Sequence, residues 1–169
     1  MQISDKGIEF LKTMEGCIKI NGIHIIYDDK NGKPVNLNEP LPKGATIGYG
    51  HLIKQNEDFK NGITESEAIT LLKHDILTTE QFIKNNITTI LTQNQYDALV
   101  SLIYNIGSKN FINSSVFKYI NNHDFYNPIY PDLEHAWKAW NQYHGKQIQG
   151  LINRRQKEWN MYKNGIYDF

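Results

Sequence analysis

The segment Thr46-Ile47-Gly48-Tyr49-Gly50-His51 marks the point at which the character of the chain changes. Before it, β-branched residues from Ile18 to Tyr27 are interrupted by turn formers, and Asn21-Gly22 has the composition of a hairpin turn. After Gly62, apolar residues recur at helical spacing almost to the end of the chain. We therefore expect a small antiparallel sheet of two to four strands followed by helices.

The helices are predicted from apolar periodicity and from terminal signals. A first helix spans Asp5 to Met14 and leaves Glu15 at its C-terminus. Capping-box patterns at Thr64 and Thr92 begin two long helices, and Gly107 is expected to end the second as a left-handed terminator. Three further helices are expected at 115–121, from 132 towards 145, and at about 149–164.

These elements predict an α+β fold that is mostly α. We expect a single domain, 1–169, with a β-containing lobe at about 15–60. A helical lobe at about 61–165 would include the N-terminal helix. A cleft between the two lobes is the expected ligand site, because ligands favour such concave boundaries.

The composition excludes several classes of protein. The chain has 169 residues, 18 basic and 18 acidic side chains, a formal net charge of +0 and one cysteine. That length suits one well-packed domain, and the neutral charge argues against nucleic-acid binding. No signal segment or apolar stretch of membrane-spanning length is visible, so the expectation is a soluble protein that folds in a reducing compartment.

Two kinds of carboxylate stand out. Glu15 falls at a helix C-terminus on an apolar side, where the helix dipole and desolvation are expected to raise its pKa and make it a general acid. Asp28 and Asp29 lie in a turn-rich segment, where a carboxylate stays ionised. Carboxylates in two unlike environments are what glycoside hydrolysis needs. A solvated helix end and turn-capping aspartates are the alternatives that the spacing leaves open.

Several blocks of the sequence resemble the phage-type lysozymes, the endolysin muramidases. The first runs from Glu15-Gly16-Cys17 through Tyr27-Asp28-Asp29-Lys30-Asn31-Gly32 to the Thr46–His51 segment. The second is Gln95-Tyr96-Asp97-Ala98-Leu99-Val100-Ser101 with Tyr104-Asn105-Ile106-Gly107. The third joins Trp137-x-x-Trp140, Gly145-Lys146 and Gly150-Leu151-Ile152-Asn153-Arg154-Arg155-x-x-Glu158. The likeness follows nearly the whole chain in order.

This resemblance implies roles for three residues. Glu15 would be the catalytic acid, Asp29 the second carboxylate and Thr46 the residue that helps to place a water molecule. Asp29 fits better than Asp28 because it lies two residues after Tyr27 and three before Gly32. The family cleaves the β-1,4 bond between N-acetylmuramic acid and N-acetylglucosamine without metal or cofactor, and its phage members typically invert the anomeric centre.

The sequence departs from the family at two places in the β region. Glu15 and Asp29 are 14 residues apart, which is more than the usual separation, and a further insertion covers about 33–44. Both changes are expected to lengthen the hairpin and to add a loop at the edge of the cleft. His24 falls at the usual spacing of the aspartate, so it remains an alternative for the second catalytic position.

The other candidate residues have supporting or structural interpretations. His51 is expected to make a structural hydrogen bond more readily than to transfer a proton, and Tyr49 belongs to the same substrate-binding or supporting set. Asn105 would either bind substrate or cap its helix. Lys146 could pair with Glu15, although an exposed lysine is the simpler reading. Trp137 and Trp140 are predicted to be core residues, and Cys17 a buried small side chain.

The sequence thus predicts a monomeric lysozyme that binds peptidoglycan glycan strands, needs no metal or cofactor and causes host lysis. The resemblance implies synthesis in the bacterial cytoplasm and action in the periplasm or wall, with release through a holin-type lesion. A delivered toxin would look the same. A lytic transglycosylase and a non-catalytic wall-binding module remain alternatives, and the target bacterium is not indicated.

Overall fold

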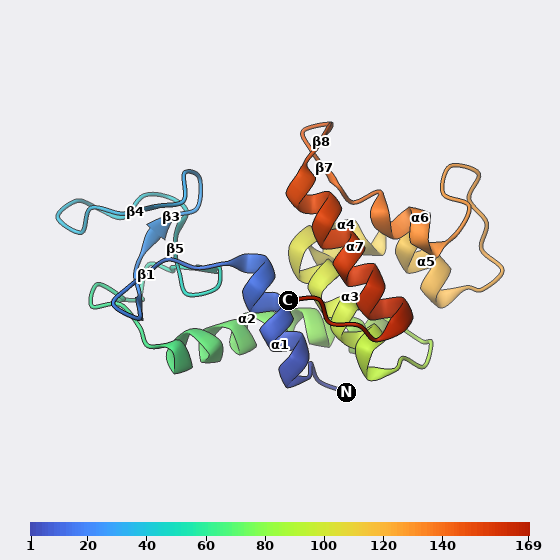
Figure 1. The fold of residues 1–169 in the computed structure, drawn as a ribbon, viewed down its shortest axis with the longest axis horizontal. Coiled ribbons are helices and arrows are strands. Elements are labelled where there is room, and N and C mark those ends of the chain that lie inside the picture. Colours follow the sequence, from blue (N-terminus) through green and yellow to red (C-terminus); the bar gives the residue numbers. More distant parts are fainter. The chain divides into compact units, whose positions relative to one another are not determined.

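The computed structural model describes residues 1–169, and the chain divides into two compact units (Figure 1). One unit is Leu11–Leu77, and the other combines Met1–Phe10 with Thr78–Phe169. Helices dominate, and the strands are short and antiparallel. The predicted α+β class, mostly α, is therefore confirmed.

A four-stranded antiparallel sheet lies in the Leu11–Leu77 unit. Its order is β4-β3-β5-β6, formed by β3 (Tyr27–Asp28), β4 (Lys33–Pro34), β5 (Ala45–Ile47) and β6 (His51–Leu52). All three residues of β5 are buried, as expected of an inner strand whose two edges are both paired. The insertion at 33–44 begins with β4 and returns to β5, so it extends the sheet by an edge strand and a loop.

A separate hairpin, β1 (Lys19–Ile20) and β2 (Ile23–His24), precedes this sheet. Its Asn21-Gly22 turn has φ values of 50° and 82°, the conformation that the Asn-Gly signal predicts. The hairpin is attached through a bridge between His24 and Ile63, with N–H to O distances of 2.9 and 3.0 Å. The predicted antiparallel strands are thus confirmed, but they form two sheets in this unit rather than one.

Two helices take part in both units. Helix α1 (Asp5–Glu15) ends where the sequence predicted, and α2 (Glu65–Asn86) begins after a capping box. In that box the Thr64 N–H donates to Glu67 across 2.7 Å, while the Glu67 N–H donates to the Thr64 hydroxyl across 3.3 Å. These reciprocal bonds satisfy donors that the first turn leaves unpaired.

The second unit is a packed set of helices (Figure 1). Its members are α3 (Gln93–Ile106), α4 (Ser108–Ile112), α5 (Ser115–Asn121), α6 (Leu133–Lys138) and α7 (Gln149–Asn164). Helix α3 packs along α7, and α6 packs against both α5 and α7. Its fully buried side chains include Leu99, Leu102, Phe111 and Trp137.

Two helix predictions need correction. Gly107 has φ 83° and ψ 145°, so it is not a left-handed terminator; its N–H ends α3, and its carbonyl begins α4. The helix expected from 132 towards 145 stops at Lys138, and β7 (Gln142–Tyr143) and β8 (Lys146–Gln147) follow. His144 and Gly145 take positive φ values of 47° and 75°, and this tight turn replaces further helix.

None of the helices is both long and apolar enough to cross a membrane.

Candidate active site

Glu15 is the last residue of α1 and is half-buried. Gly16 follows with φ 68° and turns the chain away from the helix axis. The Glu15 carboxylate lies beside Gly50 of the Gly-rich segment, because a Cβ atom built on Gly50 would be 3.9 Å from Glu15 Oε2. Gly50 has φ 90°, so its backbone conformation itself favours glycine. Gly50, the second glycine of the motif, thus places backbone without a side chain next to the candidate acid Glu15.

Asp29 and Thr46 are joined by one acceptor, the carbonyl oxygen of Gly44. The Asp29 N–H donates to it across 3.3 Å, and the Thr46 hydroxyl donates across 2.9 Å. Thr46 is buried in β5, whereas Asp29 is exposed just past β3. The end of the insertion therefore holds both residues together at the β3–β5 pair, in the interior of the sheet.

Tyr27 connects this pair to Glu15. It pairs with Thr46 in the register of β3 and β5, and only 7% of it is exposed. Burial raises the pKa of Tyr27 to about 12, and the negative charges of Asp29 and Glu15 add to the rise, although a backbone hydrogen bond with Gly50 opposes it. Both carboxylates therefore act on the same phenol, which places them around one point of the unit.

The structure separates the alternatives for the second carboxylate. Asp28 caps its own turn, accepting from the Lys30 N–H at 3.0 Å and from Asn31 Nδ2 at 3.1 Å. His24 is fully buried, and its Nε2 lies 2.9 Å from Glu65. Asp29, in contrast, is exposed and its carboxylate makes no hydrogen bond within the protein. Of these three side chains, Asp29 alone presents a carboxylate that is open to a ligand or a water molecule.

Glu65, the first residue of α2, is the centre of a polar cluster that the sequence did not reveal. Its carboxylate accepts from Tyr49 Oη at 2.6 Å, Lys19 Nζ at 2.7 Å, His24 Nε2 at 2.9 Å and Lys12 Nζ at 3.0 Å. Burial alone would raise the pKa of Glu65, but these hydrogen bonds outweigh it and hold the pKa well below its usual value. The capping-box pattern drew attention to Glu67 and gave no signal for Glu65.

Tyr49 is held by this cluster on several sides. The Lys12 ammonium lies 5.6 Å from the centre of its ring, and the His24 ring meets it edge-on at 5.1 Å. Its hydroxyl is committed to Glu65. Within its unit Tyr49 therefore supports the Gly-rich segment rather than presenting its hydroxyl to a ligand.

His51 occupies a bridge between two carboxylates. Its Nδ1 is 2.8 Å from Asp75 and its Nε2 is 3.0 Å from Glu57, and only 3% of the residue is exposed. The pKa of Glu57 is lowered, chiefly because the Lys54 N–H donates a hydrogen bond to its carboxylate. Burial acts in the opposite direction, and the hydrogen bond with His51 lowers the pKa further. With both ring nitrogens occupied, His51 braces β6 against α2, and neither partner was found from the sequence.

The remaining candidates lie in the helical unit. Asn105 is exposed on α3, and its Oδ1 accepts from Arg155 Nη2 at 2.7 Å, which leaves the amide N–H groups available. Lys146 is exposed on β8 and makes no ion pair. Trp137 is fully buried, as predicted, whereas Trp140 is half-buried.

The prediction for Cys17 was wrong. Cys17 is exposed rather than buried. The positive φ of Gly16 carries the chain off the end of α1, and the stretch between the helix and β1 lies at the surface. A small apolar side chain in the sequence therefore did not indicate a core position here.

An α+β chain with a short antiparallel sheet, a helical unit and a carboxylate at a helix end beside a Gly-rich turn belongs to the lysozyme-like class. The family profile for phage lysozyme matches residues 31–158, and the chain belongs to that family. The matched region includes Thr46 but begins after Glu15 and Asp29.

Curated relatives agree with this assignment. The endolysin of Salmonella phage P22 is 35% identical over 162 residues, which cover 94% of this chain and 95% of that protein. The endolysin of Bacillus phage PZA is 32% identical over 166 residues, which cover 98% of this chain and 56% of the relative. The chain thus spans about half the length of some relatives and nearly all of others.

Solved structures show the same fold. The muramidase domain of SpmX from Asticaccaulis excentricus has a TM-score of 0.73 and 28% identity, over 96% of this chain and 98% of that one. A P22 lysozyme variant has a TM-score of 0.72 and 32% identity, with the same coverage of 96% and 98%.

Proposed function

We propose that this protein is an endolysin-type muramidase that hydrolyses the β-1,4 bond between N-acetylmuramic acid and N-acetylglucosamine in peptidoglycan. Because the chain belongs to the phage lysozyme family, the expected activity is hydrolysis of glycosidic bonds in the bacterial wall. The endolysin and muramidase names of its relatives point to the same bond. The observation that carries the proposal is the convergence of Glu15, Asp29 and Thr46 around Tyr27 and the Gly44 carbonyl.

Glu15 is the proposed general acid. It donates its proton to the glycosidic oxygen as the bond breaks, and the bare backbone of Gly50 leaves room for the sugar beside it. General acid catalysis contributes about 10²–10⁴-fold, so positioning and electrostatic stabilisation must supply the rest of the rate enhancement.

Asp29 and Thr46 are the proposed water-handling pair. Asp29 offers an exposed carboxylate with no internal hydrogen bond, which suits a base that accepts a proton from the attacking water. The Thr46 hydroxyl donates its hydrogen to the Gly44 carbonyl, so only its lone pairs remain, as acceptors for a water molecule. A water molecule can then donate one hydrogen bond to each residue, attack the sugar with its own lone pair and pass one proton to Asp29, while its second O–H stays on the product.

The supporting roles follow from the same contacts. Glu65, Tyr49 and His51 hold the Gly-rich segment in place, and the substrate-binding role of Asn105, whose amide N–H groups are unused in the helical unit, stays a prediction. The assignment of Lys146 stays a prediction. We also propose that the protein acts on the wall after synthesis in the bacterial cytoplasm and works as a monomer released by a holin-type lesion, causing lysis as the endolysin names of its relatives imply.

The test is digestion of purified peptidoglycan by the wild type and by Glu15→Gln, Asp29→Asn and Asp28→Asn, with mass spectrometry of the glycan ends. Glu15→Gln and Asp29→Asn should lose reducing-end muramic acid, whereas the matched variant Asp28→Asn should retain it because Asp28 only caps a turn. Circular dichroism establishes that each variant folds.

Other products would contradict the proposal in distinct ways. Anhydro ends that survive Asp29→Asn would indicate a lytic transglycosylase, which needs no activated water. A wild type that binds peptidoglycan without cleaving it would be a wall-binding module.

A further inference from the structure

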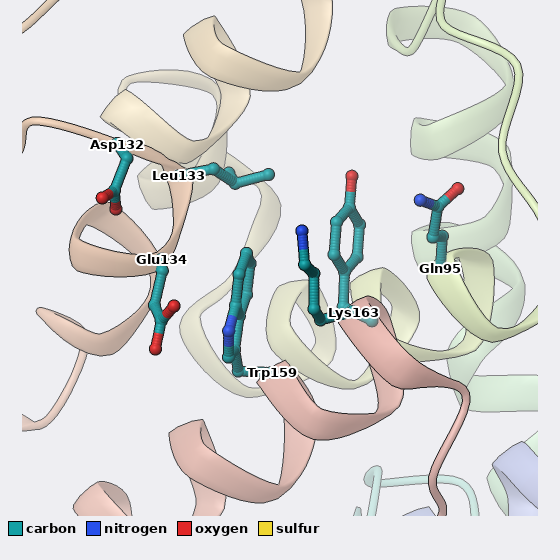
Figure 2. Close-up of a pocket in the computed structure, with 7 residues that line it drawn as sticks. Gln95, Asp132, Leu133, Glu134, Trp159 and Lys163 are labelled. Atoms are coloured by element: carbon teal, nitrogen blue, oxygen red, sulfur yellow. The ribbon is translucent and has the colours of Figure 1, made fainter.

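A cavity of about 480 Å³ opens in the helical unit, and none of the residues that line it belongs to the candidate active site (Figure 2). It lies where the first turn of α3, the start of α6 and the last turns of α7 meet. Its volume falls within the range of about 300–1,000 Å³ that is typical of small-ligand sites.

One wall of this cavity is aromatic. The rings of Trp159 and Tyr162 stack with centroids 5.5 Å apart and planes 15° from parallel. Figure 2 shows the Trp159 ring between Glu134 on one side and Lys163 on the other, with Leu133 above it. Because the two stacked rings cover one face of each other, this wall offers the outer face of the pair. An apolar face with polar groups around it suits a ligand that has one apolar face and a polar edge, as a pyranose ring has.

The cavity also holds hydrogen-bond donors that nothing in the protein uses. Neither the Trp159 indole N–H, the Tyr162 hydroxyl nor the Lys163 ammonium makes a hydrogen bond or ion pair. Gln95 uses only its carbonyl oxygen, which accepts from the Thr92 N–H at 3.0 Å, so its amide N–H groups remain free. Burial raises the pKa of Tyr162, which keeps its hydroxyl protonated as a donor.

The two carboxylates of the cavity are each engaged through one oxygen. Asp132 caps α6 by accepting from the His135 N–H at 2.8 Å and faces His135 Nδ1 at 2.7 Å. Glu134 pairs through one oxygen with Lys138. Lys163 is thus the one charged side chain of the lining without a partner, since Asp132 faces His135 and Glu134 pairs with Lys138. The other unused groups are mainly donors, so the complementary ligand carries acceptors and a negative charge.

We propose that this cavity, defined by Gln95, Glu134, Trp159, Tyr162 and Lys163, is a second glycan-binding site that takes one N-acetylated sugar bearing a carboxylate, the chemistry of a muramic acid residue. Lys163 meets the carboxylate, Gln95 donates to the acetamido oxygen, and the sugar ring lies on the aromatic wall. The inference rests on the proposed function, because that reaction supplies the polymer. Occupancy would hold the protein on insoluble wall while the catalytic residues act.

The test follows the side chains themselves by ¹H–¹⁵N NMR in the Glu15→Gln background. The probe is the disaccharide N-acetylglucosaminyl-N-acetylmuramic acid, which lacks the cleavable bond. We expect saturable shifts of the Trp159 indole N–H and the Gln95 side-chain amide, which distinguish this site from binding elsewhere. The N-acetylglucosamine dimer, which has no carboxylate, should bind about tenfold more weakly, the scale of one lost charged hydrogen bond.

Lys163→Ala should cause the same loss of about tenfold in affinity for the muramic acid disaccharide. Lys163 is exposed, so the substitution leaves the core intact. The matched control is Lys84→Ala, another exposed lysine in the last turn of a helix, which should bind like the parent protein. Tyr162→Phe, which removes only the hydroxyl, provides a second variant that preserves the ring.

Absence of saturable shifts, or equal affinities for the Lys163→Ala and Lys84→Ala variants, overturns this proposal. Cleavage is measured separately with Glu15 intact. Lys163→Ala should digest soluble glycan fragments at the wild-type rate and insoluble walls more slowly. Wild-type cleavage without binding in the cavity would refute this inference alone, whereas absence of wild-type cleavage would refute the proposed function.

Discussion

The Tyr49 hydroxyl donates to Glu65 Oε1 across 2.6 Å and so ties the Gly-rich segment to the first turn of α2. Lys12, one helical turn before Glu15, reaches the same oxygen at 3.0 Å. One carboxylate therefore fixes the end of α1 and the segment that lies beside Glu15. The geometry of the candidate acid depends on a residue outside the motif that carries the chemistry.

Glu65→Gln should lower the free energy of unfolding by about 1–2 kcal/mol at neutral pH, measured by urea denaturation. An amide keeps the shape but removes the charge that two lysines and a histidine share. Hydrogen bonds to charged groups contribute about 1.5–3 kcal/mol, and partial exposure of this side chain reduces the effect. Glu39→Gln, on a loop where Glu39 accepts only from Asn36, is the control and should change stability little.

The stability of the protein should fall in acid because of the same carboxylate. The pKa of Glu65 is lower in the folded protein than in the unfolded chain, so the unfolded chain binds more protons. The resulting stability is present above the unfolded-state value of about 4.3 and is lost as the pH falls through the folded-state pKa. Glu57, whose pKa is also lowered, contributes with the same sign.

Urea midpoints measured between about pH 5 and pH 2.5 test this dependence. The wild type should lose more stability over this interval than Glu65→Gln, so the two curves should converge in acid. Parallel curves would show that Glu65 does not titrate with a depressed pKa in the folded state.

Gly62→Ala should be far more damaging than Gly22→Ala, although both glycines have positive φ, 72° and 82°. A Cβ atom at Gly62 would lie 2.5 Å from Ile23 Cγ2 and 2.7 Å from the His24 carbonyl oxygen, whereas nothing lies within 4 Å of one at Gly22. Backbone strain costs each variant roughly 1–2 kcal/mol, and overpacking adds about 1–3 kcal/mol at Gly62 alone. Equal losses of unfolding free energy would contradict this steric explanation.

In the helical unit, Glu158→Gln should destabilise the fold by about 3–5 kcal/mol, the usual result of breaking a buried ion pair. Glu158 is fully buried between Arg154 and Arg155, each with a nitrogen 3.0 Å from a carboxylate oxygen. Ser101→Ala removes a hydroxyl that donates to Glu158 at 2.7 Å and accepts from Arg154 at 3.4 Å, and it should cost about 1–3 kcal/mol. Thermal melting of the two variants checks both the order and the size of these losses.

Thr46→Val should lower kcat for glycan cleavage by about a hundredfold, the scale of misplacing a reacting group by about 1 Å. Valine fills the buried site in β5 but has no oxygen to hold the water or to bind Gly44. Thr46→Ser keeps the oxygen and should retain most of the activity. A Thr46→Val enzyme with unchanged kcat, measured on soluble glycan fragments, would remove Thr46 from the mechanism.

The helical remainder of the fold was largely predictable from local signals. The capping boxes at Thr64 and Thr92 and the periodicity of α3 each act within a few residues, so they can be identified without knowledge of the fold. Competition between local structures was harder to judge. The chain forms a tight turn at His144-Gly145 where the apolar pattern predicted further helix, and Gly107 ends one helix and begins the next.

The sequence by itself determined most of the helices and the Asn-Gly hairpin, because residue type and spacing encode these features. Its resemblance to the phage-type lysozymes selected Glu15, Asp29 and Thr46 as candidate residues. Only the tertiary structure decided that Asp28 caps a turn, that His24 is buried and that Asp29 stays open. It alone revealed Glu65. Four donors from separate segments meet on that carboxylate, and convergence of this kind depends on how distant segments pack, which no local pattern records.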